Sequence, residues 1–252
     1  FLFGRNLDED FESALEDAQT GVISPQRLNE AVTRVLALKT SLKLNEKKNF
    51  TDENYANIVG CRKHRELARQ CADQAITLVK DTQNLLPVTP ATHKRIWLHI
   101  LGDNPAFRGG SKCKEQVIAR LESEGFEVTC VEGAQRDRMF TEIPVKELKA
   151  RFDLILYVAN MVTGGNNTTN RLHYAPRICG ESPQHVMDIP TIFVSLGDPF
   201  HFVDVPMIRT FINCYDHSDA TLDMLMKKIT GRSAFKGVSP IDPFCGVWGA
   251  SI

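Results

Sequence analysis

The chain has 252 residues, which is enough for one large domain or for one domain with appendages. Hydrophobic residues make up 42% and charged residues 24%, as in an ordinary soluble globular protein. The net charge of −1 gives no overall field that would recruit nucleic acid or an anionic membrane surface. The seven cysteines form no CxxC pair, which argues against a zinc or thioredoxin-like site and favours reduced thiols in a cytoplasmic protein. We expect no cofactor and no metal.

The first forty residues predict the end of a larger structure. The apolar run Phe1–Phe3 is typical of a strand whose beginning lies before residue 1. Asp8 is expected to cap a helix over 8–18, which Gly21 ends. Ser24 followed by Pro25 is a helix start, and apolar residues at helical spacing then predict an amphipathic helix over 25–40. The charged segment 43–54 is interpreted as a linker.

Strands and helices alternate through the rest of the chain. We expect helices over 63–74, 112–123, 145–149 and 218–229, and strands over 75–79, 96–101, 126–131, 154–158, 191–196 and 208–214. Alternation of this kind predicts a mostly parallel sheet. The strand runs are almost continuously apolar, as expected when helices cover both faces of the sheet. The sequence therefore predicts an α/β fold, a three-layer α/β/α sandwich, with ligand-facing loops at the carboxyl ends of the strands, near 102–110, 160–173 and 197–202.

The loop over 160–173 is the strongest candidate for ligand contact. It is rich in amides and hydroxyls, which donate and accept hydrogen bonds as sugar hydroxyls require. Arg171 adds a guanidinium for a polar group or a carboxylate. We therefore predict substrate contacts from Asn166, Asn167, Arg171 and His173. A surface loop without a ligand has the same composition, and this alternative stays open.

Other motifs are weaker. The loop 101–111 follows a strand and precedes a helix, but it lacks the patterns of phosphate-binding loops. Ser195 lacks the flanking glycines of a nucleophile elbow, so we interpret it as a strand end. His201 lies between Asp198 and Asp204, which permits an acid/base role, although capping by Asp198 is the favoured interpretation.

Four segments resemble glycoside hydrolase family 3, and in particular its β-N-acetylhexosaminidase-like branch. FLFGRNLDEDF (1–11) resembles the last strand of the family's barrel and the loop that follows it. GVISPQRLNEAVTRVLALKTSLKL (21–44) resembles the signature that closes the family's (β/α)8 barrel. ELARQCADQAITLVKDTQNLLPV (66–88) resembles the motif that opens its second domain, with Ile76 to Asp81 departing from the usual leucine-leucine-lysine-asparagine. The tail FKGVSPIDPFCGVW (235–248) resembles the C-terminus of hexosaminidase-like members.

The resemblance implies a domain division. Residues 1–42 would be a remnant of the barrel, with its last strand and helices, 43–60 a linker, and 61–252 the C-terminal sandwich. In the family the aspartate nucleophile and the histidine-aspartate acid/base pair lie in the barrel, before the part that this chain matches. Some members take an acid/base glutamate from the second domain, but Glu181 has no motif match that would assign it this role. We therefore expect no catalytic residue here.

The resemblance also implies a function for the parent protein. It would be an O-glycosyl hydrolase of the β-N-acetylhexosaminidase or β-glucosidase type that removes terminal β-linked sugars with retention, with carbohydrate and its own barrel as partners. We expect this chain alone to be inactive and, without the barrel, to self-associate as a homodimer. Two alternatives stay open: a non-catalytic glycan-binding or dimerisation module, and an unrelated flavodoxin-like nucleotide domain.

Overall fold

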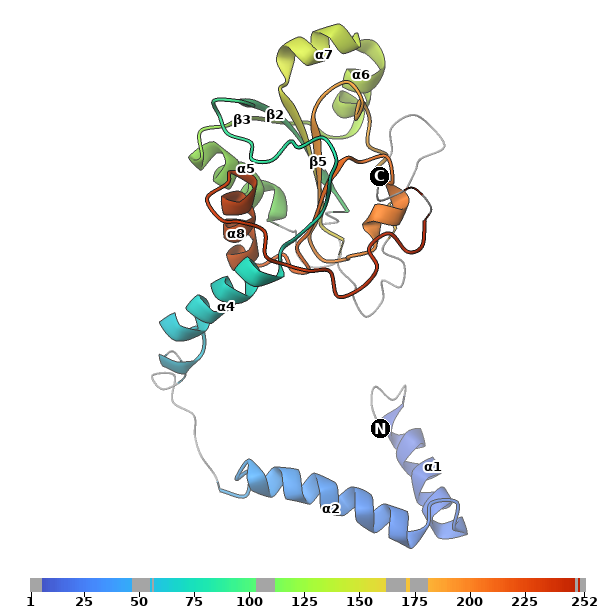
Figure 1. The fold of residues 1–252 in the computed structure, drawn as a ribbon. Coiled ribbons are helices and arrows are strands. Elements are labelled where there is room, and N and C mark those ends of the chain that lie inside the picture. The colour runs from blue at the N-terminus through green and yellow to red at the C-terminus, as the bar shows by residue number, and fades with distance from the viewer. Residues whose placement is uncertain are drawn as a thin grey trace. The chain divides into compact units, whose positions relative to one another are not determined.

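The structure is a computed structural model, and it describes residues 6–46, 55, 57–102, 112–161, 171–172, 181–247 and 249. The chain divides into two compact units, Phe1–Val59 and Gly60–Ile252. Figure 1 shows both units, which are considered separately below. The predicted strand at Phe1–Phe3 and most of the predicted linker lie outside the described residues.

The first unit contains the two predicted helices, α1 (Leu7–Thr20) and α2 (Pro25–Ser41). Ser24 caps α2 as predicted, because its hydroxyl accepts a hydrogen bond from the backbone N–H of Arg27 at 3.2 Å. Gly21 ends α1 in the left-handed conformation, with φ of 84°. The prediction that Asp8 caps α1 was wrong: Asn6 is the cap, and its side-chain oxygen accepts from the N–H of Asp8 at 3.2 Å.

Both helices carry an apolar stripe that nothing in their own unit buries. Within the described residues, neither α1 nor α2 contains a buried side chain. Phe11 is 66% exposed, and Val35 on α2 is 53% exposed. An amphipathic helix with an uncovered apolar face is typical of a surface that packs on another body.

In the second unit, the described residues form one sheet of six strands in the order β1-β6-β5-β4-β2-β3. The strands are β1 (Thr77–Asp81), β2 (Arg95–Leu101), β3 (Glu127–Cys130), β4 (Leu154–Ala159), β5 (Thr191–Ser195) and β6 (Thr210–Asn213). β1 runs antiparallel to β6, and the other neighbouring pairs are parallel. The predicted mostly parallel sheet is confirmed.

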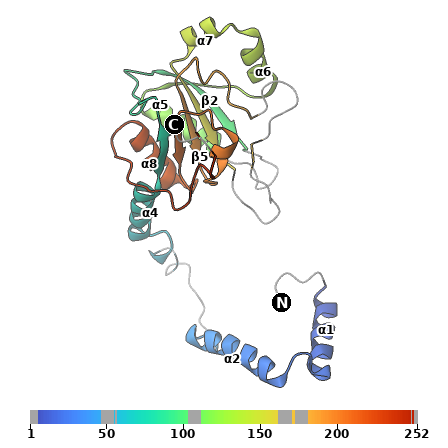
Figure 2. The same ribbon diagram turned by 45° about the vertical axis from the view of Figure 1, so that its right-hand side comes forward.

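Helices cover both faces of this sheet, as Figures 1 and 2 show. One face packs against α4 (Arg62–Ala75), α5 (Cys113–Ser123) and α8 (Asp219–Ile229). The other packs against α6 (Gly133–Glu142), α7 (Val145–Arg151) and the short 3₁₀ helix η2 (His201–Asp204). Successive strand residues alternate between the two cores, so every residue of β4 is buried. This double burial explains the continuous apolar runs and confirms the three-layer sandwich.

One strand boundary and one helix differ from the sequence-based prediction in an informative way. β1 begins at Thr77 because α4 continues to Ala75, the first residue of the segment predicted as strand, and Ile76 is its C-cap. α6 was not predicted at all. Its N-cap residue, Glu132, makes no capping hydrogen bond, and its core contacts come from the adjacent residues Met139 and Phe140. Neither feature gives the periodic signal on which helix prediction depends.

The connection after β1 explains part of the motif over 66–88. The carboxylate of Asp81 accepts hydrogen bonds from the backbone N–H groups of Leu85 at 3.1 Å and Leu86 at 3.3 Å. It also accepts from the hydroxyl of Thr210 at 2.7 Å, at the start of the neighbouring strand β6. Asp81 thus fixes the turn and joins it to the sheet.

Among the described residues no helix has both the length and the apolar character needed to cross a membrane.

Candidate functional site

The carboxyl ends of four parallel strands lie in register at one edge of the sheet. Leu101 pairs with Ala159, Ala159 pairs with Ser195, and Ser195 pairs with Asn213. The loops that follow these residues therefore emerge side by side, which is where open α/β sheets bind ligands. Gly102 and Met161 show how closely two of these loops approach, since a Cβ on Gly102 would lie 2.2 Å from the Cγ of Met161.

Ser195, Asp198 and His201 form a buried polar cluster just beyond β5. The Ser195 hydroxyl lies 2.7 Å from Nδ1 of His201 and donates its proton to the backbone carbonyl of Asp198. Because that proton is committed, Ser195 accepts from the Nδ1–H of His201, the reverse of the direction that activates a serine nucleophile. Ser195 and His201 are each only 1% exposed. The cluster therefore fixes the loop, in agreement with the interpretation of Ser195 as a strand end.

Asp198 has a turn-forming role. Its carboxylate accepts from the backbone N–H of Phe200 at 2.8 Å, immediately before η2. Its second oxygen lies 4.0 Å from Nε2 of His201, beyond hydrogen-bond distance. The prediction that Asp198 caps the helix was wrong, because the N-cap residue of η2 is Phe200. The distance of 4.0 Å also leaves no hydrogen bond for an acid/base pair between Asp198 and His201.

Asp204, the last residue of η2, holds the end of the amide-rich loop. Its carboxylate accepts hydrogen bonds from the guanidinium of Arg171, with Nε at 2.7 Å, and from the backbone N–H of Leu172 at 3.2 Å. The Asp204 side chain is 9% exposed, whereas that of Arg171 is 54% exposed. The hydrogen bond to Asp204 raises the pKa of Arg171, so its charge is permanent.

The structure describes only part of the predicted contact set. Arg171 lies at the carboxyl-end edge through its pairing with Asp204, a contact that sequence reasoning did not predict, and its contact with substrate stays a prediction. Asn166, Asn167 and His173 lie outside the described residues, as do residues 103–111 of the candidate phosphate loop, and their assigned roles also stay predictions. Glu181 is described and is partly buried. Among the described residues, no group of His, Cys, Asp and Glu could hold a metal ion.

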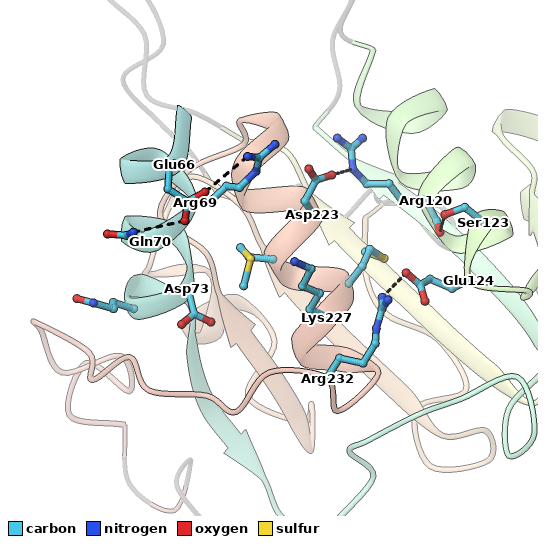
Figure 3. Close-up of a pocket in the computed structure, with 13 residues that line it drawn as sticks. Glu66, Arg69, Gln70, Asp73, Arg120, Ser123, Glu124, Asp223, Lys227 and Arg232 are labelled. Carbon is cyan, nitrogen blue, oxygen red and sulfur yellow. Dashed lines mark hydrogen bonds and ion pairs between the residues drawn. The ribbon is translucent and has the colours of Figure 1, made fainter. Parts of the chain in front are cut away.

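A groove of about 690 Å³ lies between α4, α5 and α8, on the opposite layer of the sandwich (Figure 3). Ion pairs line it. Arg120 on α5 binds Asp223 on α8 at 2.7 Å, and Arg232 after α8 binds Glu124 after α5. These ion pairs join the helices on either side of the groove. Because their charges neutralise one another, the groove offers no excess charge to a ligand.

Asp73, which lines this groove, holds the chain's C-terminal tail. Asp73 on α4 accepts hydrogen bonds from the ammonium groups of Lys236 at 2.7 Å and Lys228 at 3.1 Å, and from the Ser233 hydroxyl at 2.5 Å. The Lys236 and Ser233 hydrogen bonds hold the pKa of Asp73 far below its ordinary value. The Lys228 side chain is 0% exposed. This cluster attaches the tail to α4 and is structural.

Comparison with known proteins identifies the family. No protein-family model matches the chain. A β-N-acetylglucosaminidase/β-glucosidase from Cellulomonas fimi is 39% identical over 98% of the chain, which spans 44% of that relative. The structure of β-glucoside phosphorylase BglX matches 98% of the chain with a TM-score of 0.83 and 38% identity, and the chain covers 44% of it.

A more distant structure agrees in fold. A glycoside hydrolase family 3 β-N-acetylglucosaminidase from Paenibacillus sp. matches 90% of the chain with a TM-score of 0.60 at 16% identity, and the chain covers 41% of it. The chain therefore spans less than half the length of the relatives it matches. By sequence and by fold, it belongs to glycoside hydrolase family 3 and contains the C-terminal α/β/α domain of that family.

Proposed function

We propose that this chain is the C-terminal part of an enzyme that releases terminal β-linked sugars, N-acetylhexosaminides first and glucosides second, with retention of configuration. The observation that carries the proposal is the 39% identity to the C. fimi enzyme over 98% of the chain. A retaining mechanism needs a nucleophile and an acid/base group on either side of one glycosidic bond. The described candidates at the strand ends supply neither, since Ser195 and His201 are hydrogen-bonded to each other and the Asp198 carboxylate accepts from the backbone N–H of Phe200. We therefore infer that the chain by itself is inactive.

The contribution of this domain would be to form one wall of the substrate cleft. The carboxyl-end edge of the sheet is the part suited to this role, because four strands deliver their loops there in register. Asn166, Asn167, Arg171 and His173 are proposed to contact the sugar from that edge. Arg171 supports this placement, since Asp204 holds it at the edge while 54% of its side chain stays exposed.

Phosphorolysis is a second candidate reaction for the same site. The neighbour with 38% identity and a TM-score of 0.83 is a β-glucoside phosphorylase. In phosphorolysis, phosphate replaces water as the acceptor of the glycosyl group, and the product is a sugar 1-phosphate. The two outcomes share the donor sugar and differ only in the acceptor.

The test compares two proteins on two substrates. The first protein is this chain. The second is this chain preceded by the barrel region that the family resemblance implies, here called the longer protein. Each is incubated with p-nitrophenyl β-N-acetylglucosaminide and β-glucoside, with and without inorganic phosphate. We expect nitrophenol release from the longer protein only, with the N-acetylglucosaminide preferred. Free sugar as product indicates hydrolysis, whereas sugar 1-phosphate indicates phosphorolysis. Turnover by the chain alone, or no turnover by the longer protein, would overturn the proposal.

The exposed apolar stripes of α1 and α2 bear on the remaining proposals. Their exposure supports packing against the barrel of the same protein, and in the isolated chain it favours association into a homodimer. Sedimentation of the chain with and without residues 1–59 measures this association.

A cytoplasmic location is also proposed, because none of the described cysteines is in a disulfide. Cell fractionation with an antibody to the protein tests that location.

A further inference from the structure

The 3₁₀ helix η2 is a rigid platform at the strand-end edge. On one side, His201 is hydrogen-bonded to Ser195 at the end of β5. On the other, Phe202 is fully buried. Its ring makes edge-to-face contacts with Phe211 on β6, at a centroid distance of 5.1 Å, and with Phe244 in the C-terminal tail, at 5.3 Å. Asp204 is therefore fixed by packing from the sheet and from the tail, two residues beyond the buried ring of Phe202.

This platform aligns Arg171 through more than one contact. Asp204 receives two N–H groups of the guanidinium and, with its second oxygen, the backbone N–H of Leu172. A carboxylate that binds both the side chain and the following backbone N–H restricts the direction of the guanidinium as well as its position. Nε and Nη2 bind Asp204, and no other described residue binds Nη1, so two of the five N–H donors of the guanidinium are available there.

The charges around Arg171 indicate what those donors can bind. Asp204 is in hydrogen-bond contact with the guanidinium and neutralises its charge. The pair therefore has no excess positive charge with which to offset the desolvation of an anionic ligand. A neutral oxygen, such as a sugar hydroxyl or an N-acetyl carbonyl, can accept from Nη1 without this penalty.

We propose that Asp204 is a positioning residue for sugar binding: it fixes Arg171 so that Nη1 donates to a neutral oxygen of the donor sugar. The proposal rests on the proposed function, because it assigns Arg171 to the sugar. It goes beyond that function in assigning a role to Asp204 and in excluding phosphate as the ligand of Arg171. Asp204 itself touches no substrate and acts only through Arg171.

The test uses steady-state kinetics of the longer protein with Asp204→Asn and Arg171→Lys. Loss of correct positioning costs up to about a hundredfold in rate or binding. We expect each variant to raise KM for the sugar substrate about tenfold or more while kcat changes less than about threefold, the pattern of lost uniform binding. In phosphorolysis, the KM for phosphate should stay unchanged.

A matched control lies at the opposite edge of the same sheet. Asp153 precedes β4 and accepts from Nε of Arg95 at 3.1 Å and from the backbone N–H of Arg95 at 2.8 Å. Like Asp204, it binds an arginine side chain and a backbone N–H, although here the N–H belongs to the arginine itself. Asp153→Asn should lower the melting temperature without changing either KM. A rise in KM for Asp153→Asn equal to that for Asp204→Asn would show that both act through stability alone, and would overturn the proposal.

A double variant separates positioning from other roles. If Asp204 acts only through Arg171, adding Asp204→Asn to Arg171→Ala should leave kcat/KM within about twofold of Arg171→Ala alone. A further tenfold loss would contradict the proposal, as would an unchanged sugar KM in Asp204→Asn or a raised KM for phosphate. Failure of the proposed function is distinct, since the unsubstituted longer protein would then show no turnover of any β-glycoside.

Discussion

Removing the carboxylate of Asp73 should be among the most destabilising single changes in the second unit. The Lys228 ammonium is fully buried, and it donates hydrogen bonds to Asp73 at 3.1 Å and to the carbonyl of Ala234 at 2.8 Å. Asp73→Ala leaves that charge buried without its carboxylate, which costs about 3–5 kcal/mol. For a domain of this size, 1 kcal/mol lowers the melting temperature by about 2–4 °C. We therefore expect a fall of about 10 °C, measured by circular dichroism.

Two further variants separate the buried charge from its neighbours. Lys228→Met replaces the buried ammonium by an apolar group of similar length, so it should cost less than Asp73→Ala. The double variant Asp73→Ala with Lys228→Met should recover part of the loss. Glu127→Ala is the control, because it breaks the Lys94–Glu127 pair, in which both side chains are more than half exposed, and should cost less than about 1 kcal/mol. Equal losses for Asp73→Ala and Glu127→Ala would refute the reasoning.

The same cluster predicts a dependence on pH. Hydrogen bonds from Lys236 and Ser233 hold the pKa of Asp73 below its ordinary value of 3.8 in the folded protein. The unfolded chain therefore binds a proton first as the pH falls. The stabilisation is complete above the ordinary pKa and is lost progressively below it. Unfolding free energy should thus fall more steeply below pH 4 in the unsubstituted protein than in Asp73→Asn, and parallel curves would contradict this.

Three other substitutions test the packing at the loops. Gly102→Ala should destabilise the protein by about 1–3 kcal/mol in urea unfolding, because φ is 70° and the new Cβ would lie 2.2 Å from the Met161 side chain. Adding Met161→Ala should restore part of the lost stability, and no restoration would argue against the clash. Gly237→Ala should cost a similar amount, since its Cβ would lie 2.4 Å from the backbone oxygen of Ala75, and a melting temperature equal to that of the unsubstituted protein would refute this. Asp81→Ala should lower the melting temperature more than Asp81→Asn, which keeps one acceptor for the turn N–H groups, and the reverse order would contradict the role assigned to that carboxylate.

The elements that sequence predicted well share a physical property: their signal is local and periodic. The apolar run of β4 and the Ser24-Pro25 start of α2 are each contained within a few residues, and the structure confirms both. α6 lacks such a signal and was not predicted. Asp8 was assigned as a cap in place of Asn6 because both residue types cap helices and stand two positions apart.

The candidate site divides in the same way. The amide-rich loop and Arg171 stand out by composition, which is readable from the sequence. The sequence does not reveal the partner of Arg171. Asp204 lies 33 residues further along the chain, and nothing in its local sequence distinguishes it from the other aspartates as that partner. The direction of the proton between Ser195 and His201 is likewise decided by a backbone carbonyl that only the folded loop brings within reach.

The sequence by itself determined the layer architecture and the family of this protein, because burial on both faces of a sheet imposes a pattern on every strand, and family motifs extend over contiguous residues. The tertiary structure decided the pairings: Asp73 with Lys228, 155 residues apart, and Asp204 with Arg171. Such contacts join single residues across the fold, so their energies depend on distances that the chain acquires only when the sheet and its helices pack together.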